Sequence, residues 1–223
     1  MGRRQERGLS LVELLVGAAI GLIVVAATGS VVAAHQGAAR RIQLEARVMQ
    51  DLRGAAELVS RDLRRAGHWA AAGSGVRRGD EPIVVNPHAE IAAASGAAAV
   101  IALSFSTGAG DPTSVDDSER FGFRLRNGAI EMQLGSRNWQ TLSDPGTVFV
   151  TSFSVVPRVD EADLATFCAK PCSAGSTTCP PRQQIRSYAI SVSGRSPIDA
   201  SIRRELRSAV RVRNDVVVGS CEA

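Results

Sequence analysis

A single carboxylate, Glu13, interrupts the apolar run at the beginning of this chain. From Leu9 to Ala34 there are 26 residues, and Glu13 is the only charged one among them. At ~1.5 Å per residue, a helix of this length can cross a hydrocarbon core of ~30 Å. A carboxylate within such a span costs roughly 2.5–3.5 kcal/mol on insertion scales, and a nearby cation lowers that cost. We therefore expect Glu13 to have a specific charge-pairing role.

Four cysteines form the second set of residues with a chemistry of their own. They are Cys168, Cys172, Cys179 and Cys221. Zinc sites usually contain cysteines separated by two residues, whereas here three and then six residues lie between the first three cysteines. In an exported domain two disulfides are the better interpretation, and four cysteines allow three pairings. Because Cys221 lies near the C-terminus, we expect it to hold the last strand to a loop over residues 160–184. We favour the pairs Cys168–Cys221 and Cys172–Cys179.

Patterns typical of catalysis or metal binding are missing from the sequence. The three histidines, His35, His68 and His88, have no cysteine or carboxylate beside them at zinc-site spacing. The acidic loop over residues 111–119 lacks the residue order of a calcium loop, so we expect a solvated loop and leave calcium open. The formal net charge is +4, but no basic stripe with interleaved aromatic residues is visible. We therefore expect no enzyme, no cofactor, no metal and no direct binding of nucleic acid.

Arginines lie on one side of the apolar run. Arg3, Arg4 and Arg7 precede the run, whereas the flank after it begins with His35-Gln36-Gly37. The positive-inside rule then places the leader in the cytoplasm and the following domain outside. In a bacterium that side is oxidising, which suits the four cysteines.

The N-terminal pattern resembles the processing site of type IV prepilins and type II secretion pseudopilins. A short basic leader ends at Gly8, Leu9 and three further residues follow, and Glu13 precedes the long apolar remainder. The resemblance implies that a prepilin peptidase cuts between Gly8 and Leu9 and methylates the new amino group of Leu9. It also implies that Glu13 guides assembly. A removed signal peptide, whose apolar core is usually 7–15 residues, and a plain single-span anchor remain as alternatives.

The helical pattern continues beyond the apolar run. After Arg40-Arg41 the apolar residues recur at steps of three and four, and charged residues fill the other positions. This pattern predicts an amphipathic helix with one apolar stripe, and Gly67 is a plausible stop. We expect one helix from about Ser10 to Ala66, apolar all round in its first half.

Alternating strands follow the helix. They are predicted over Ala98–Phe105, residues 121–126, residues 130–134, Trp139–Leu142, Val148–Val156, residues 188–193 and residues 206–212. Asn127-Gly128 between the second and third runs predicts a hairpin with a type I′ turn. One long helix and several short alternating strands predict an α+β domain with an antiparallel sheet.

Three later stretches refine the resemblance. Ala66-Gly67-His68-Trp69 resembles the helix end of PilW-like minor pilins. Trp139-Gln140-Thr141-Leu142 and Val210-Arg211-Val212-Arg213-Asn214 resemble strands of that group, the first of them also found in J-type pseudopilins. The implied fold is pilin-like, with the long N-terminal helix packed on the sheet domain. We expect a leader over 1–8, a membrane or filament-core half-helix over 9–34, an amphipathic half over 35–69 and a periplasmic domain over 70–223.

The resemblance therefore implies a PilW-like minor pilin that primes or caps a type IV pilus. The partners implied by the resemblance are the prepilin peptidase, the other minor pilins, the major pilin, the inner-membrane assembly platform and membrane lipid. The expected location is the inner membrane and then the filament at the cell surface. A J-type minor pseudopilin of type II secretion is the nearest alternative. A membrane-anchored periplasmic binding or enzymatic domain is an alternative of another class.

Overall fold

The computed structural model describes residues 10–76, 84–94, 100–108 and 113–222. These residues form two compact units that divide between Leu44 and Glu45. The described part of the first unit is the beginning of one long helix, α1 (Leu11–Arg65). The second unit contains the rest of α1 and all the described strands. The bounds of α1 confirm the helix predicted from about Ser10 to Ala66.

Within the second unit, α1 buries one stripe of its surface. The buried residues are Val48, Leu52, Ala55, Ala56, Val59, Leu63 and, just past the helix end, Ala66. Their spacing of mostly three and four places them on one face, as the sequence pattern predicted. Gly67 follows the helix with a φ of +76°, a backbone conformation that favours glycine. Its N–H donates to the carbonyl oxygen of Ser104 at 3.0 Å and so turns the chain toward the sheet.

The first sheet is antiparallel and follows the chain in order. Its strands are β1 (Ala92–Ala94), β2 (Val100–Ser104), β3 (Arg120–Arg126), β4 (Ala129–Leu134) and β5 (Trp139–Thr141). The turn between β3 and β4 has positive φ at both Asn127 (51°) and Gly128 (75°), as a type I′ turn requires. A Cβ on Gly128 would also lie 2.3 Å from the ring of Phe149. The predicted hairpin is therefore confirmed, and only glycine fits its second position.

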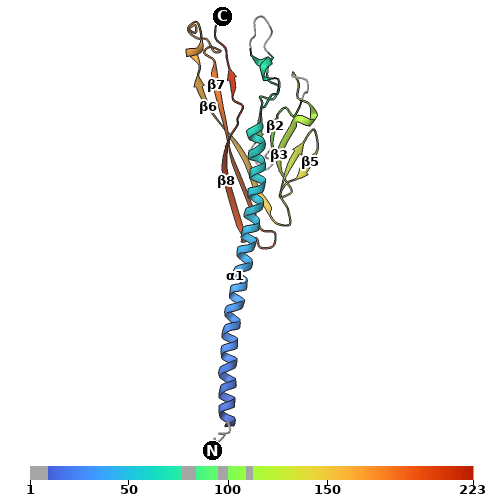
Figure 1. Cartoon of the computed structure of the whole chain (residues 1–223), viewed down its shortest axis with the longest axis vertical. Coiled ribbons are helices and arrows are strands. Elements are labelled where there is room, and N and C mark those ends of the chain that lie inside the picture. Colours follow the sequence, from blue (N-terminus) through green and yellow to red (C-terminus); the bar gives the residue numbers. More distant parts are fainter. Residues whose placement is uncertain (1–9, 77–83, 95–99, 109–112, 223) are drawn as a thin grey trace, which may run out of the picture. The chain divides into compact units, whose positions relative to one another are not determined.

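The second sheet contains the long strands. They are β6 (Phe149–Asp163), β7 (Arg182–Arg195), β8 (Arg203–Arg211) and β9 (Val216–Val218). All pairs are antiparallel, with β7 between β6 and β8, while β9 pairs with the beginning of β7. Figure 1 shows the second half of α1 between this sheet and the first one. Buried residues of the helix and of both sheets form one hydrophobic cluster.

The α+β class and the antiparallel pairing confirm the predicted fold, but several details differ. The strands divide between two sheets, and β1 and β9 were not predicted. β6 continues through Pro157 to Asp163, and β7 begins at Arg182. The loop that holds three of the cysteines therefore runs from 164 to 181, shorter than the predicted 160–184. Pro157 lies in an edge strand, which is where proline is found within sheets.

Candidate functional site

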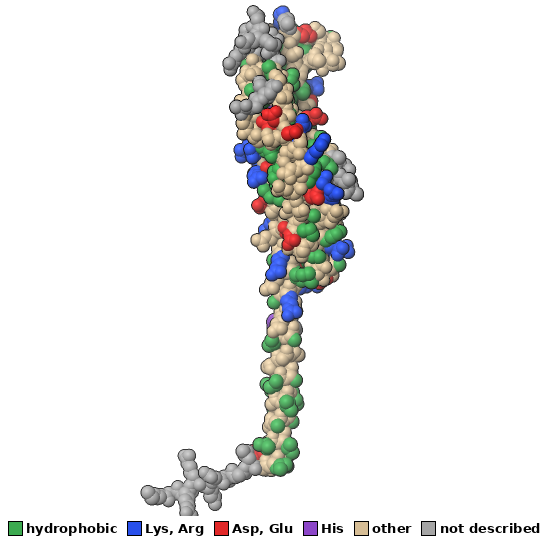
Figure 2. Space-filling view, turned by 90° about the vertical axis from the view of Figure 1, so that its right-hand side faces the viewer, with side chains coloured by type: hydrophobic (Ala, Val, Ile, Leu, Met, Phe, Trp, Pro, Cys, Tyr) green, Lys and Arg blue, Asp and Glu red, His purple; other side chains and the backbone are tan. Residues whose placement is uncertain are grey.

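The first part of α1 carries a run of exposed apolar side chains. Its large apolar side chains are Leu11, Val12, Leu14, Leu15, Val16, Ile20, Leu22, Ile23, Val24, Val25, Val31 and Val32, each between 52% and 74% exposed. Figure 2 shows hydrophobic side chains along the visible face of this segment. The segment is long and apolar enough to cross a membrane by length and composition. Residues 11–33 span about 34 Å as a helix, compared with ~30 Å for a hydrocarbon core.

The hydroxyl groups within this segment are satisfied by the helix itself. Thr28 Oγ1 donates to the carbonyl oxygens of Val24 at 2.9 Å and Val25 at 3.0 Å, and Ser30 Oγ donates to Ala27 at 2.7 Å. In a medium without water, each polar group that lacks an internal partner costs several kcal/mol. The segment can therefore lie in lipid, or among other apolar helices, without unsatisfied hydroxyls.

Glu13 differs from these hydroxyl groups, which have hydrogen-bond partners within the helix. It lies in the first turn of α1, where the partial positive charge of the helix N-terminus favours a carboxylate. The helix begins with the bond from Leu14 N to Ser10 O at 3.1 Å, which fixes the position of that turn. Among the residues that the structure describes, the Glu13 side chain has no hydrogen bond or ion pair. The other two residues of the predicted processing site, Gly8 and Leu9, lie outside the described residues.

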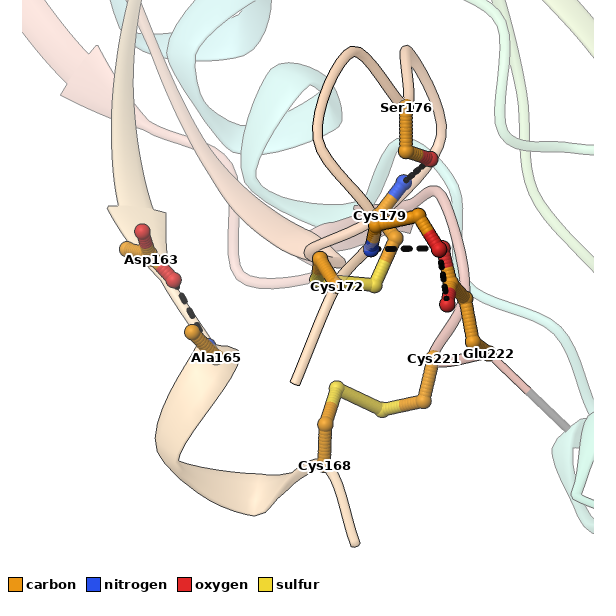
Figure 3. Close-up of a disulfide and its surroundings, with 9 residues drawn as sticks. Asp163, Ala165, Cys168, Cys172, Ser176, Cys179, Cys221 and Glu222 are labelled. Atoms are coloured by element: carbon orange, nitrogen blue, oxygen red, sulfur yellow. Dashed lines mark hydrogen bonds between the residues drawn. A yellow bond between two sulfur atoms is a disulfide. The ribbon is translucent and has the colours of Figure 1, made fainter. Parts of the chain in front are cut away.

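Both disulfides occur in the second unit. Cys168 is bonded to Cys221 and Cys172 to Cys179, which are the pairs favoured from the sequence. Figure 3 shows that the first bond joins the loop after β6 to the C-terminal segment.

Hydrogen bonds strengthen the same junction. Glu222 accepts bonds from Ser173 N at 2.8 Å and Ser173 Oγ at 2.7 Å, and these bonds lower the pKa of its carboxyl. Ser220 N donates to Thr178 O at 2.9 Å. The C-terminal segment is therefore held to the cysteine loop by covalent and polar contacts together.

The acidic loop is organised by internal contacts. Asp116 and Glu119 form a capping box around η2 (Asp117–Glu119). Glu119 is buried and accepts hydrogen bonds from Thr107 N at 3.0 Å and Asp116 N at 3.2 Å. Burial raises the pKa of this carboxyl, but the hydrogen bonds and nearby His88 outweigh it, so the net shift is downward. Its oxygens are thus committed within the fold, while Asp111 of the same loop lies outside the described residues.

His88 is the partner of Glu119 that sequence spacing did not reveal. Its Nε2 lies 3.7 Å from Glu119 Oε2, and both side chains are buried. Burial lowers the pKa of His88, although Glu119 opposes the shift. In the described structure, its Nδ1 is buried without a hydrogen-bond partner. The pair comes from segments 31 residues apart, so no local motif could have indicated it.

A second buried polar group ties the end of α1 to the last strands. Arg186 donates through Nη2 to Asn214 O at 2.9 Å and through Nη1 to Ala89 O at 2.5 Å. Asn214 Nδ2 in turn donates to the carbonyl oxygens of Arg65 at 3.3 Å and Ala66 at 3.0 Å. These bonds satisfy carbonyl groups that the helix end would otherwise leave open. The stretch Val210–Asn214, singled out as a motif, therefore supplies the cap of the long helix.

Comparison with known families agrees with the two parts of the structure. Residues 3–29 match the prokaryotic N-terminal methylation motif, and this range includes Gly8, Leu9 and Glu13. Residues 41–212 match the family described as prepilin peptidase-dependent protein B. No curated protein and no solved structure matches the chain.

Proposed function

The chain belongs to the family of prepilin peptidase-dependent protein B, and from that premise we propose that it is a PilW-like minor pilin of a type IV pilus. It would be a structural subunit, one of a small set that primes filament assembly at the inner membrane or caps the tip. The observation that carries the proposal is the coincidence of the methylation motif with an exposed apolar helix bearing one carboxylate. Such a helix needs cover, and lipid and a bundle of like helices are both suitable.

The proposed pathway starts with a subunit stored in the membrane. Prepilin peptidase cuts after Gly8 and methylates the amino group of Leu9, which becomes the first residue. The leader over 1–8 stays in the cytoplasm and the folded domain in the periplasm. The half-helix over 9–34 then leaves the lipid and joins the helical bundle of the filament. Its apolar surface stays out of water throughout, so this transfer carries little hydrophobic cost.

In this proposal Glu13 determines the axial register at which the subunit joins the filament. Once Leu9 is the first residue, its amine is a cation one helical turn from Glu13. In the membrane the carboxylate pairs with this amine, and in the filament it pairs with the amine of a neighbouring minor or major pilin. An opposite charge lowers the cost of a carboxylate in an apolar environment. A correctly staggered neighbour presents its amine at that depth, so the pairing selects one axial register.

The processing step has a direct test. Gly8→Val should leave the leader attached, because the peptidase must fit a residue without a bulky side chain beside the cut. Gly17→Val is the matched control, since Gly17 lies in the same apolar run and a Cβ there meets nothing within 4 Å. Immunoblots should show a larger form for Gly8→Val alone, and mass spectra of wild type should show N-methyl-Leu9. Normal cleavage of Gly8→Val would overturn the assignment.

The choice between a pilus and a secretion system needs a separate measurement. Deleting the gene should abolish or reduce surface filaments and leave secretion of exported enzymes intact. Loss of secretion with normal filaments would instead establish the J-type pseudopilin alternative.

A further inference from the structure

A groove of about 840 Å³ separates α1 from β8 within the second unit. On the helix side it is lined by Arg53, Gly54, Glu57 and Arg64, and on the strand side by Leu206 and Ser208. The buried hydroxyl of Ser208 has no hydrogen-bond partner among the described residues. The groove therefore combines apolar lining residues with charged ones and a buried hydroxyl that has no partner among the described residues.

The groove is shorter than the edge of β8 beside it. On the helix its lining runs from Arg53 to Arg64, a rise of about 17 Å. β8 runs for about 27 Å from Arg203 to Arg211. An extended peptide of about nine residues therefore matches the edge of β8, and about five of its residues would lie along the groove.

β8 presents a free backbone edge beside the groove. Its nine residues pair regularly with β7 on one side, and in the described structure no strand pairs with its other side. The strand contains no proline, and its pairing has no bulge. A long regular edge of this kind is a template for an added strand.

The charge of the groove selects its occupant. In the described part of the chain, neither Arg53 nor Arg64 forms an ion pair or a side-chain hydrogen bond, whereas Arg61 is shared with Asp62 at 3.1 Å. Glu57 is the one acidic residue among the described residues that line the groove. Of the β8 arginines, Arg204, Arg207 and Arg211 are already paired with Glu45, Glu205 and Asp215, so the unpaired positive charge of the groove comes from Arg53 and Arg64. An acidic segment complements this surface, while a second copy of β8 would bring like charges together.

Gly54 is a further sign that something approaches the helix here. Glycine is unfavourable inside a helix relative to alanine. A Cβ at this position would meet no atom of the chain within 4 Å, so the protein's own packing does not require glycine. A residue without a side chain leaves room for the backbone of a partner to come close.

We propose that this groove binds an extended acidic segment, which adds to the free edge of β8 as a further strand and packs against Gly54. The segment would belong to another pilin-like subunit, and this part alone rests on the proposed function. The added strand would cover the free edge and pair its carboxylates with Arg53 and Arg64. Two contacts would then select the neighbouring subunit. Glu13 would set its axial position, and the groove would determine which subunit binds.

Fluorescence anisotropy with the full chain in non-ionic detergent micelles tests the groove. The probe is a fluorescein-labelled nine-residue peptide of alternating Val and Glu, and its Val and Lys counterpart is the comparison. We expect the acidic peptide to bind in a salt-dependent manner and to slow hydrogen exchange of β8 amides. Arg53→Glu with Arg64→Glu should weaken binding on the order of tenfold. Arg126→Glu with Arg158→Glu is the matched control, since both side chains lie outside the groove, and it should leave binding unchanged.

A second variant pair separates the groove from general charge effects. Gly54→Trp should block binding without unfolding the chain, because a Cβ at this position meets nothing within 4 Å and the side chain starts in open space. Gly37→Trp changes another helix glycine with open space around it and should bind normally. Equal binding of the basic peptide, equal binding of an acidic helical peptide, or self-association through β8 would each overturn the proposal. If the peptide binds but Leu9 is not methylated, the groove proposal stands and the pilin assignment is overturned. If Leu9 is methylated but the peptide does not bind, the pilin assignment stands and the groove proposal is overturned.

Discussion

The two disulfides should differ in what they contribute to stability. Cys168 and Cys221 are 53 residues apart, whereas Cys172 and Cys179 are 7 apart. In the chain-entropy treatment, a cross-link stabilises by restricting the unfolded chain, and the effect grows with the logarithm of the loop. The long loop then gives about 4 kcal/mol and the short loop about 2.4 kcal/mol at 25 °C. Cys168→Ala with Cys221→Ala should therefore cost more than Cys172→Ala with Cys179→Ala.

The burial of Cys179 adds a cost to the loss of the short bridge, which opposes this order of stabilities. Cys179 is buried, with 6% of its surface exposed, while Cys221 is exposed. Removing the sulfur of Cys179 leaves a small cavity, which adds to the cost of losing the short bridge. If loss of the long bridge still lowers the free energy of unfolding more, the entropic difference between the two loops exceeds the cost of this cavity.

Urea unfolding of the full chain in detergent measures the difference. Trp69 is buried, so its fluorescence reports unfolding of the second unit. Hydrogen exchange adds a local reading: loss of the Cys168–Cys221 bond should speed exchange of the amides of Val216–Val218, because β9 is only three residues long. Equal losses for the two variants, or a larger loss for the short bridge, would refute the expectation that the loop-length term outweighs the packing of Cys179.

Three further predictions concern single side chains. Glu13→Leu should keep membrane insertion and cleavage but reduce co-purification with the other pilins; undiminished incorporation would remove the charge-pairing role. Because burial lowers the pKa of His88 below its unfolded value of about 6.5, the unfolded state binds more protons below that pH. Its contribution to stability is therefore complete above pH 6.5 and is lost as the pH falls, so urea midpoints should drop between pH 7.5 and 5.5, and less so in His88→Asn. Asn214→Leu should lower the free energy of unfolding by about 1–3 kcal/mol, because the carbonyl of Ala66 loses its donor, while Asn138→Leu at an exposed site should have little effect in the same urea assay.

The elements that could be predicted from the sequence are those with a local signal. The long helix was visible because its apolar run and its apolar stripe each repeat over many residues. The hairpin was visible because Asn127-Gly128 is a turn that few other dipeptides can form. β1 was not predicted, since its three alanines carry no alternation and alanine is depleted in strands.

The second half of β6 was missed for a different reason. Val156 and Val159 are 51% and 48% exposed, so this part of the strand has no buried face to impose alternation. Its pairing with β7 is fixed by backbone bonds and by Glu161 with Arg182, at 3.3 Å. The candidate site also contains features with a local sequence signal and features without one. Glu13 and the cysteines could be named from spacing, whereas the groove beside β8 depends on which elements the fold brings together.

The division of α1 between the two units bears on how such a subunit could move between environments. The hydrophobic cluster of the second unit begins on the helix at Val48, and none of the described residues before Val48 belongs to it. The domain therefore completes its core without the apolar segment over 11–33, whose large side chains all remain exposed. Because no described residue before Val48 belongs to this cluster, the surroundings of the segment can change while the domain stays folded. A substitution in the segment such as Glu13→Leu should then affect assembly alone, with the urea midpoint of the domain unchanged. A change in that midpoint would show that the two parts are energetically coupled and would argue against this independence.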